Sequence, residues 1–269
     1  MHGQYTLRIP RHACTPRDTA RAGDLWRVIQ DAAVNDATDR GWPPERFRAA
    51  GTGFVVRELR AVHHREAGFG EDLDVRTQIA DARREILVRR ETQIIGVMDA
   101  TAEWVHIGPT GGPQRASAAL VAAFPADRSA PASPALVEVE EVTARPLPDF
   151  TFSPWWTEMD PLAHTNHPRY IDWADETLAR ALHQRGIDPL GVVPLADRVR
   201  FRLGARATDV VTVSGRVLGM ARVGQRTGLA CMFRASRPGP SGPEVVADMY
   251  IVRGHIDPDA ALALLWAAA

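Results

Sequence analysis

The sequence contains no lysine, and all 32 of its basic residues are arginine. They are balanced by 33 acidic residues, which leaves a net charge of −1 at pH 7. A protein that binds nucleic acid through the phosphate backbone normally carries a surplus of basic residues. We therefore expect no nucleic-acid partner.

Cysteines and long apolar runs are also scarce. Cys14 and Cys231 are the only cysteines, and their separation fits neither a metal-binding motif nor a disulfide-rich secreted domain. No segment reaches the about 20 apolar residues that a membrane helix needs, and the first residues show no signal-peptide pattern. These absences predict a cytoplasmic protein without a membrane span or a bound metal.

The sequence does contain enough apolar residues for a packed core. Hydrophobic residues make up 45% and charged residues 24% of the 269 residues, which are ordinary values for a globular protein. This length lies between one large domain and two domains of usual size.

Two segments show the three-and-four spacing of apolar residues that is typical of one helical face. The first runs from Asp24 to Gly41 and the second from Pro168 to Gly186. Proline suits the first turn of a helix, and glycine commonly ends one. The two glycines are 145 positions apart (186 − 41), which is the first sign of a repeat.

Runs of alternating or β-branched residues follow each helix, and Gly, Pro or Asp separate them as in antiparallel strands. The predicted strands are residues 54–63, 73–79, 85–94 and 99–107 in the first half and 197–203, 210–220, 227–235 and 245–253 in the second. A leading strand is predicted at residues 4–10 and again at 150–156. The order and type of the elements match between the halves.

The repeat predicts an α+β fold of two tandem hot-dog units, each a long helix wrapped by an antiparallel sheet. The expected division is an N-terminal unit at 1–107, a linker at 108–137 and a C-terminal unit at 138–269. Within the linker, residues 118–124 can form a short helix. We expect the units to join their sheets into one pseudo-dimeric double hot dog, which would cover open sheet edges. The protein would then be a monomeric double hot dog or a homodimer of it.

Polar chemistry is densest in the turn that leads into the second helix, at Asp160, His164, Asn166 and His167. Backbone amides before Pro168 have no helical partner and can bind developing negative charge. Asp160 can act on a carbonyl held there, either as a nucleophile or as the base that activates water. A structural role stays open from spacing alone, because Asp-Pro is a common turn and Asn166 or His167 can cap a helix.

The segment from Asp160 to Asn166, followed by Tyr170, Ile171 and Trp173, resembles a family signature, D-x-x-x-H-x-N…Y-(I/L)-x-W. This is the signature of acyl-ACP thioesterases and of the related single-unit acyl-CoA thioesterases. Residues 24–41, 65–77 and 83–84 also look like the N-terminal hot dog of acyl-ACP thioesterases. The resemblance implies hydrolysis of a fatty-acyl thioester carried on CoA or on acyl carrier protein, with no cofactor.

Three positions depart from the plant-type acyl-ACP pattern. Leu162 stands where that pattern has a catalytic Asn, and Gly204 and Ala205 stand where it has a Glu-Cys pair. The plant-type mechanism cannot be intact in this chain. The form Asp160-Pro161-Leu162-Ala163-His164 is instead similar to the D-P-x-G-H of single-unit acyl-CoA thioesterases.

That similarity implies a simpler scheme centred on Asp160 as base or nucleophile. Backbone amides at Asn166 and His167 would stabilise the oxyanion, while the His164 and Asn166 side chains would position water, Asp160 or the pantetheine amide. The matching loop of the first half, residues 17–23, has Asp18 but no His or Asn at matching spacing. One active site per chain is therefore expected.

Two other functions compete with hydrolysis. A hot-dog enoyl-thioester hydratase or dehydratase also uses an Asp and a His before the helix, but with a spacing one residue longer and an added Asn. A non-catalytic acyl-binding protein is the other alternative, given the missing Asn and Glu-Cys positions.

Overall fold

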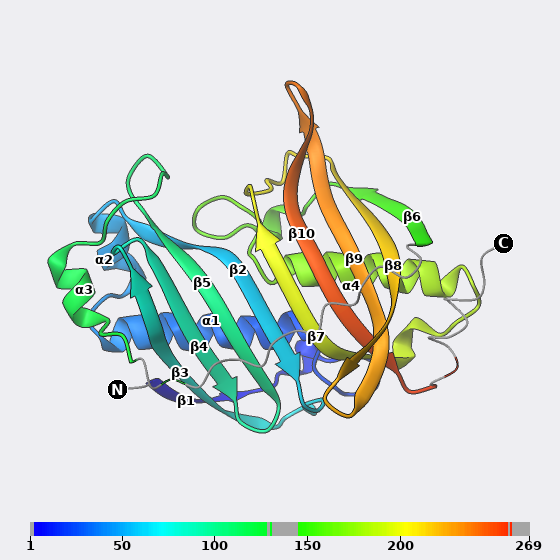
Figure 1. Ribbon diagram of the computed structural model, residues 1–269. Coiled ribbons are helices and arrows are strands. Elements are labelled where there is room, and N and C mark those ends of the chain that lie inside the picture. Colours follow the sequence, from blue (N-terminus) through cyan, green and yellow to red (C-terminus); the bar gives the residue numbers. More distant parts are fainter. Residues whose placement is uncertain (1–2, 128–129, 131–144, 258, 260–269) are drawn as a thin grey trace. The chain divides into compact units, whose positions relative to one another are not determined.

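The structure is a computed structural model that describes residues 3–127, 130, 145–257 and 259 (Figure 1). Its chain divides into two compact units. The first comprises residues 3–14, 18–20 and 24–127, and the second comprises residues 15–17, 21–23 and 145–257. Within the described part of the chain, no helix is long and apolar enough to cross a membrane.

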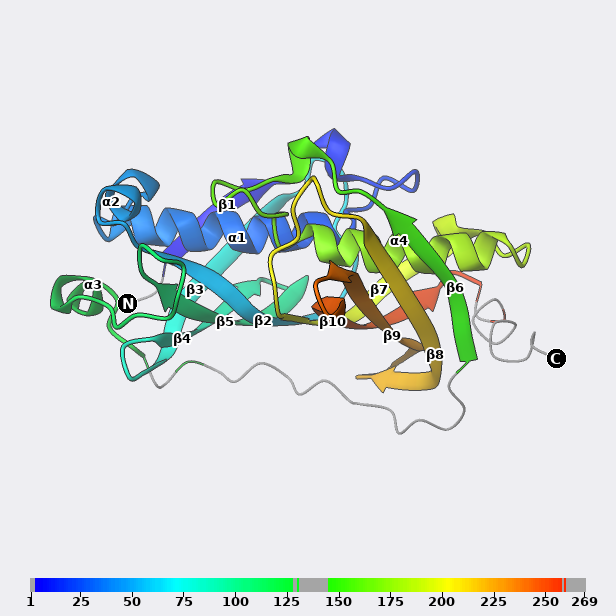
Figure 2. The ribbon, with the colours of Figure 1, turned by 90° about the horizontal axis from the view of Figure 1, so that it is seen from above.

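The first unit is a five-stranded antiparallel sheet packed on one long helix. Its elements are β1 (Gly3–Arg8), η1 (Arg11–Ala13), α1 (Ala22–Asp39), α2 (Pro44–Ala49), β2 (Gly53–His63), β3 (Asp72–Arg83), β4 (Leu87–Ile94), β5 (Met98–Ile107) and α3 (Ala118–Ala123). The strand order is β1-β3-β4-β5-β2. Helix α1 lies along one face of this sheet (Figures 1 and 2) and buries Leu25, Trp26 and Ile29 to 2% exposure or less.

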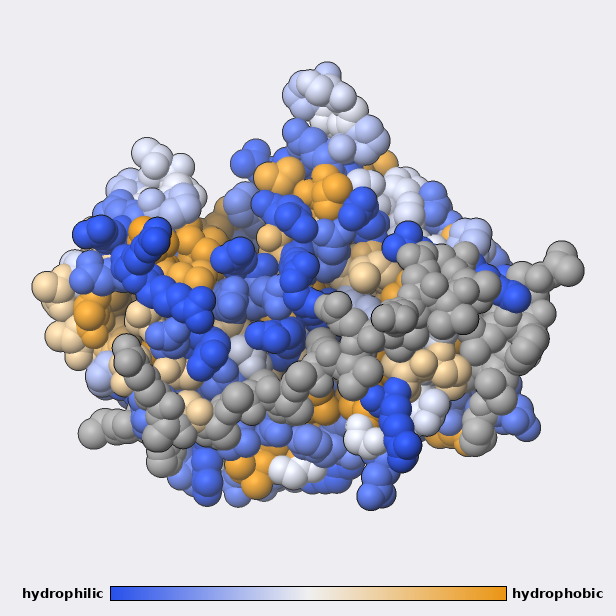
Figure 3. All heavy atoms as spheres, in the orientation of Figure 1, coloured by the Kyte–Doolittle hydropathy of each residue, from blue (hydrophilic) through white to orange (hydrophobic). Residues whose placement is uncertain are grey.

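The second unit repeats this architecture. Its elements are β6 (Arg145–Phe152), η2 (Trp156–Glu158), α4 (Arg169–His183), η3 (Pro189–Gly191), β7 (Val192–Phe201), β8 (Val211–Val223), β9 (Arg226–Gly239) and β10 (Gly242–His255). The strand order is β7-β10-β9-β8-β6, again antiparallel. Helix α4 buries Tyr170, Ile171, Ala174 and Leu178 against the sheet. Figure 3 is viewed from the strand side, where hydrophilic residues cover much of the surface.

The hot-dog prediction is confirmed for each unit. Both predicted helices are present, and Gly41 (φ 78°) and Gly186 (φ 73°) follow them in the left-handed region that favours glycine. The predicted helix at 118–124 is confirmed as α3, while residues 128–129 and 131–144 of the linker region lie outside the described residues. The pseudo-dimeric joining of the sheets and the boundaries 1–107, 108–137 and 138–269 stay predictions.

Two details of the prediction were wrong. Strand β6 ends at Phe152, so the predicted strand at 150–156 extends too far. Trp155 and Trp156, which continued the apolar run, are 72% and 75% exposed and lead into η2. Helix α2 was not predicted, because its six residues have no buried side chain and so give no apolar stripe.

Each unit also buries an arginine that pairs with an aspartate of its long helix. In the first unit, Arg90 donates to Asp36 over 2.7 Å. In the second unit, Arg253 contacts Asp175 at 2.7 Å and Asp197 at 2.6 Å, and its side chain is only 2% exposed. Burial disfavours a charged Arg253, but the two carboxylates more than offset this and hold its pKa above the usual value.

Candidate active site

The turn that carries Asp160 is held by four hydrogen bonds within residues 159–165. Met159 and Thr165 pair across its base. The Asp160 N–H donates to the His164 carbonyl (2.7 Å), and the Ala163 N–H donates to the Asp160 carbonyl (2.9 Å). Asp160 Oδ1 accepts the N–H groups of Leu162 (2.8 Å) and His164 (3.2 Å). One carboxylate oxygen therefore shapes the turn, as aspartate often does.

The first half of the chain contains the same turn, 145 positions earlier. Cys14 pairs with Ala20 as Met159 pairs with Thr165, and Asp18 has φ 60° where Ala163 has φ 57°. There the Arg17 N–H donates to the hydroxyl of Thr15 (3.2 Å). Thr15 thus occupies the place of Asp160.

Asp18, the acidic residue that the sequence offers in the first turn, is therefore not the counterpart of Asp160. Asp18 corresponds to Ala163 and forms an ion pair with Arg11. By the same offset, Thr19 and Arg21 stand at the positions of His164 and Asn166. The turn occurs in both halves of the chain, but among these two turns the second alone has the carboxylate, imidazole and amide together.

The His164 ring packs against the backbone of the loop that follows β7. A Cβ built on Gly204 would lie 2.5 Å from Cγ and 2.7 Å from Nδ1 of the ring. Carbon atoms in contact normally stay about 3.5–4.0 Å apart. The ring can therefore take this place only because position 204 has no side chain.

The neighbouring residue, Ala205, ties this loop to the turn and to α4. Its carbonyl accepts the Thr165 N–H (2.7 Å), and its N–H donates to the Tyr170 hydroxyl (3.2 Å). Burial raises the pKa of Tyr170 to about 12; the Ala205 N–H opposes this rise and the charge of Asp160 adds to it. The phenol stays protonated near neutral pH and keeps one hydrogen to donate.

The backbone amide of Asn166 does not have the oxyanion-binding role that the sequence predicted. Its backbone N–H donates to the Glu158 carbonyl (2.9 Å), so this amide is already engaged and does not serve as an oxyanion donor in this conformation. The expected oxyanion role therefore falls to the His167 amide, and that assignment stays a prediction.

Two side-chain oxygens beside this amide are buried, and neither has a hydrogen-bond partner among the residues that the structure describes. They are Oδ1 of Asn166 and Oγ1 of Thr165, a residue that is only 4% exposed. An unsatisfied buried polar atom is costly unless water or a ligand completes it. Thr165 could not be predicted as a site residue, because threonine at this spacing is not a known catalytic pattern.

Comparisons with known proteins bear on this arrangement. No family model matches the sequence, and no curated protein matches it at a significant level. A putative oleoyl thioesterase from Lactobacillus plantarum is similar in structure, with a TM-score of 0.76 and 17% identity over 95% of this chain and 96% of that one.

Two further solved structures are similar over nearly their whole length. An acyl-ACP thioesterase from Bacteroides thetaiotaomicron has a TM-score of 0.70 and 17% identity over 94% of this chain and 97% of that one. The 12:0-ACP thioesterase from Umbellularia californica has a TM-score of 0.71 and 16% identity over 94% of both chains. The chain has the fold of these thioesterases.

Within this fold, the departures from the plant-type pattern have a structural explanation. The Glu position is Gly204, where any side chain would collide with the His164 ring as placed. The Asn position is Leu162, whose side chain is 46% exposed and whose backbone N–H binds Asp160. The polar side chains that this segment of the chain offers are therefore Asp160, His164, Thr165 and Asn166.

Among the described residues, no group of three or more His, Cys, Asp or Glu side chains is placed to hold a metal ion. His164 and His167 belong to no such group. The available chemistry at this turn is that of a carboxylate, an imidazole, an amide and two hydroxyls.

Proposed function

We propose that the protein hydrolyses an acyl thioester, fatty acyl-ACP or acyl-CoA, to a free acid and a thiol at the turn of residues 159–165. The observation that carries the proposal is that Thr15 stands at the position in its own turn that Asp160 has in the second turn. Because a threonine hydroxyl holds the matching turn in the first half of the chain, the turn itself does not need a carboxylate. The shared fold with solved thioesterases supports the same assignment.

Asp160 would act through Oδ2, since Oδ1 is engaged by two backbone amides. As a general base, Oδ2 takes a proton from water, and the water oxygen attacks the thioester carbonyl carbon. The tetrahedral intermediate then collapses, the C–S bond breaks, and the proton passes to the departing sulfur. As a nucleophile, Asp160 would first attack the carbonyl carbon and expel the thiolate, which takes up a proton; water then hydrolyses the resulting acyl anhydride to the free acid and the Asp160 carboxylate.

The surrounding groups would position the reactants. The His167 amide, next to the start of α4, would donate to the oxyanion. The buried oxygens of Thr165 and Asn166 lack partners among the described residues, so they can bind water or the pantetheine amide. The His164 ring, fixed against Gly204, would orient the water or Asp160.

The proposal is tested by incubating the purified chain with a panel of acyl-CoA and acyl-ACP substrates of different chain lengths and measuring free thiol. We expect thiol release from at least one substrate. Binding of acyl thioesters without release would instead support an acyl-binding protein, and hydration of an enoyl thioester would support a hydratase. Either result would overturn the proposal.

A second prediction concerns Gly204. Gly204→Ala places a methyl group against the His164 ring and should displace it. Because small displacements of catalytic groups can cost about 100-fold in rate, we expect kcat to fall by about that factor. The matched control is Gly254→Ala, whose added Cβ meets its nearest neighbour, Leu195, at an ordinary 3.5 Å. Equal activity of the two variants would show that the ring position does not matter.

A further inference from the structure

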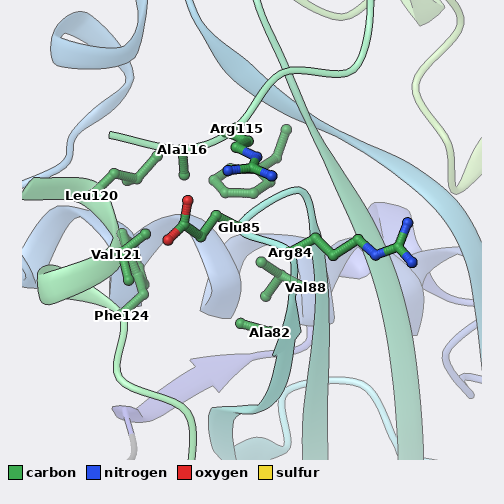
Figure 4. Close-up of a pocket in the computed structure, with 10 residues that line it drawn as sticks. Ala82, Arg84, Glu85, Val88, Arg115, Ala116, Leu120, Val121 and Phe124 are labelled. Atoms are coloured by element: carbon green, nitrogen blue, oxygen red, sulfur yellow. The ribbon is translucent and has the colours of Figure 1, made fainter. Parts of the chain in front are cut away.

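The first unit contains a cavity of about 350 Å³ that has no part in the proposed reaction. It lies between the β3–β4 hairpin, the start of β2 and α3 (Figure 4). Its wall is largely apolar, with Phe54, Val88, Leu120, Val121 and Phe124. The volume is at the lower end of the range of about 300–1,000 Å³ found for small-molecule sites.

Hydrogen bonds fix the wall segments to each other. The Ala116 N–H donates to the Glu85 carbonyl (2.7 Å), and the Asp127 N–H donates to the Ile79 carbonyl (2.8 Å). Between these two anchors, the side chain of Ser117 caps α3 by accepting the Leu120 N–H (3.2 Å). The cavity is therefore bounded by segments that are held in place at both ends of α3.

The hairpin turn at the edge of the cavity is conformationally unusual. Arg84 (φ 53°) and Glu85 (φ 60°) are both in the left-handed region, where glycine or asparagine is normally found. Residues held in such conformations cluster at ligand-binding positions. In Figure 4, the Glu85 carboxylate points into the cavity and the Arg84 guanidinium points away from it.

Three charged residues line the cavity, and because the Arg84 guanidinium points away from it, one negative and one positive group remain to face a ligand. Glu85 comes from the hairpin and Arg115 from the segment before α3, and both line the cavity. Within the described residues, neither side chain forms an ion pair or a hydrogen bond. Both side chains are exposed, so a ligand can reach them from solvent.

We propose that this cavity binds a free amino acid with an apolar side chain, such as leucine. The ammonium would pair with Glu85, the carboxylate with Arg115, and the side chain would lie on the apolar wall. A fatty acid fits less well, because its only charge, a carboxylate, would also face Glu85. An alkylamine leaves Arg115 without a partner. Charge-assisted hydrogen bonds to both ends of a zwitterion satisfy the two groups together.

The test is calorimetric titration of the full chain with leucine and with two analogues that each lack one charge. 4-Methylpentanoate lacks the ammonium, and 3-methylbutylamine lacks the carboxylate. We expect leucine to bind at least about tenfold more tightly than either analogue, because each analogue loses a hydrogen bond to a charged group. Absence of leucine binding at millimolar concentration would overturn the proposal. Binding of a fatty acid such as decanoate more tightly than leucine would overturn it as well.

Variants assign each charge to its residue. Glu85→Gln should weaken leucine binding about tenfold without weakening 4-methylpentanoate, and Arg115→Gln should weaken leucine without weakening 3-methylbutylamine. Arg84→Gln, on the side chain that points away, is the matched control and should leave all three affinities unchanged. Leucine binding that survives both Glu85→Gln and Arg115→Gln would place the ligand elsewhere. The readout does not depend on thioester hydrolysis.

Discussion

Asp160→Thr is expected to remove most thioester hydrolysis while leaving the fold of the turn intact. Threonine occupies the matching position in the turn of the first half of the chain, where its hydroxyl accepts the corresponding backbone N–H. The substitution therefore removes the carboxylate without removing the turn. Positioned acids and bases contribute about 10²–10⁴-fold to a rate, and kcat/KM should fall by that factor.

Steady-state kinetics on the best substrate of the panel, with thermal unfolding as the check on folding, measure this effect. The reciprocal variant, Thr15→Asp, is the control. It adds a carboxylate to a turn that has Thr19 and Arg21 in place of His164 and Asn166, so it should not change the rate. If Asp160→Thr kept wild-type activity, the base or nucleophile would have to be another residue.

Arg253→Met is expected to lower the free energy of unfolding by about 3–5 kcal/mol, because it leaves Asp197 buried without its cation. Arg253 is 2% exposed, and the Asp197 side chain is fully buried. Asp175, whose side chain is 32% exposed, has some access to water and should contribute less to the loss. Denaturant titration monitored by circular dichroism gives the free energy directly.

The matched control for this variant is Arg234→Met, on the exposed side of the same sheet. Arg234 pairs with Asp248 at 2.9 Å, but its side chain is 62% exposed, and such pairs contribute about 0–1 kcal/mol. Replacing Arg253, Asp175 and Asp197 together by apolar residues should restore most of the lost stability, since no buried charge then remains. Equal effects of Arg253→Met and Arg234→Met would contradict the buried-pair account.

The elements of each unit could be predicted because their signals are local. The apolar stripes of α1 and α4, and the glycines at 41 and 186 that follow them, are visible in any window of the sequence. Where the signal was ambiguous, the prediction was wrong: the apolar run through Trp155 and Trp156 resembled a strand, although both side chains lie in solvent.

The candidate site could be predicted only as a set of residues. Asp160, His164 and Asn166 are within seven positions of each other, so their proximity follows from the chain itself. The availability of individual atoms does not follow from spacing. The Asn166 N–H donates to the Glu158 carbonyl, and Oγ1 of Thr165 is buried. Both facts depend on how the turn folds back on η2 and on the loop after β7.

The sequence by itself determined that the chain is built from two similar helix-and-sheet units, and that the polar residues typical of thioesterases occur in the second. The first conclusion rests on periodicity, which is a property of neighbouring residues, and the second rests on the resemblance of a short segment to a family signature. Only the tertiary structure decided that Thr15 is the counterpart of Asp160, and that Gly204 makes room for the His164 ring. The Gly204 contact joins residues 40 positions apart (204 − 164), and such packing is fixed by the sheet and the helix around it rather than by local pattern.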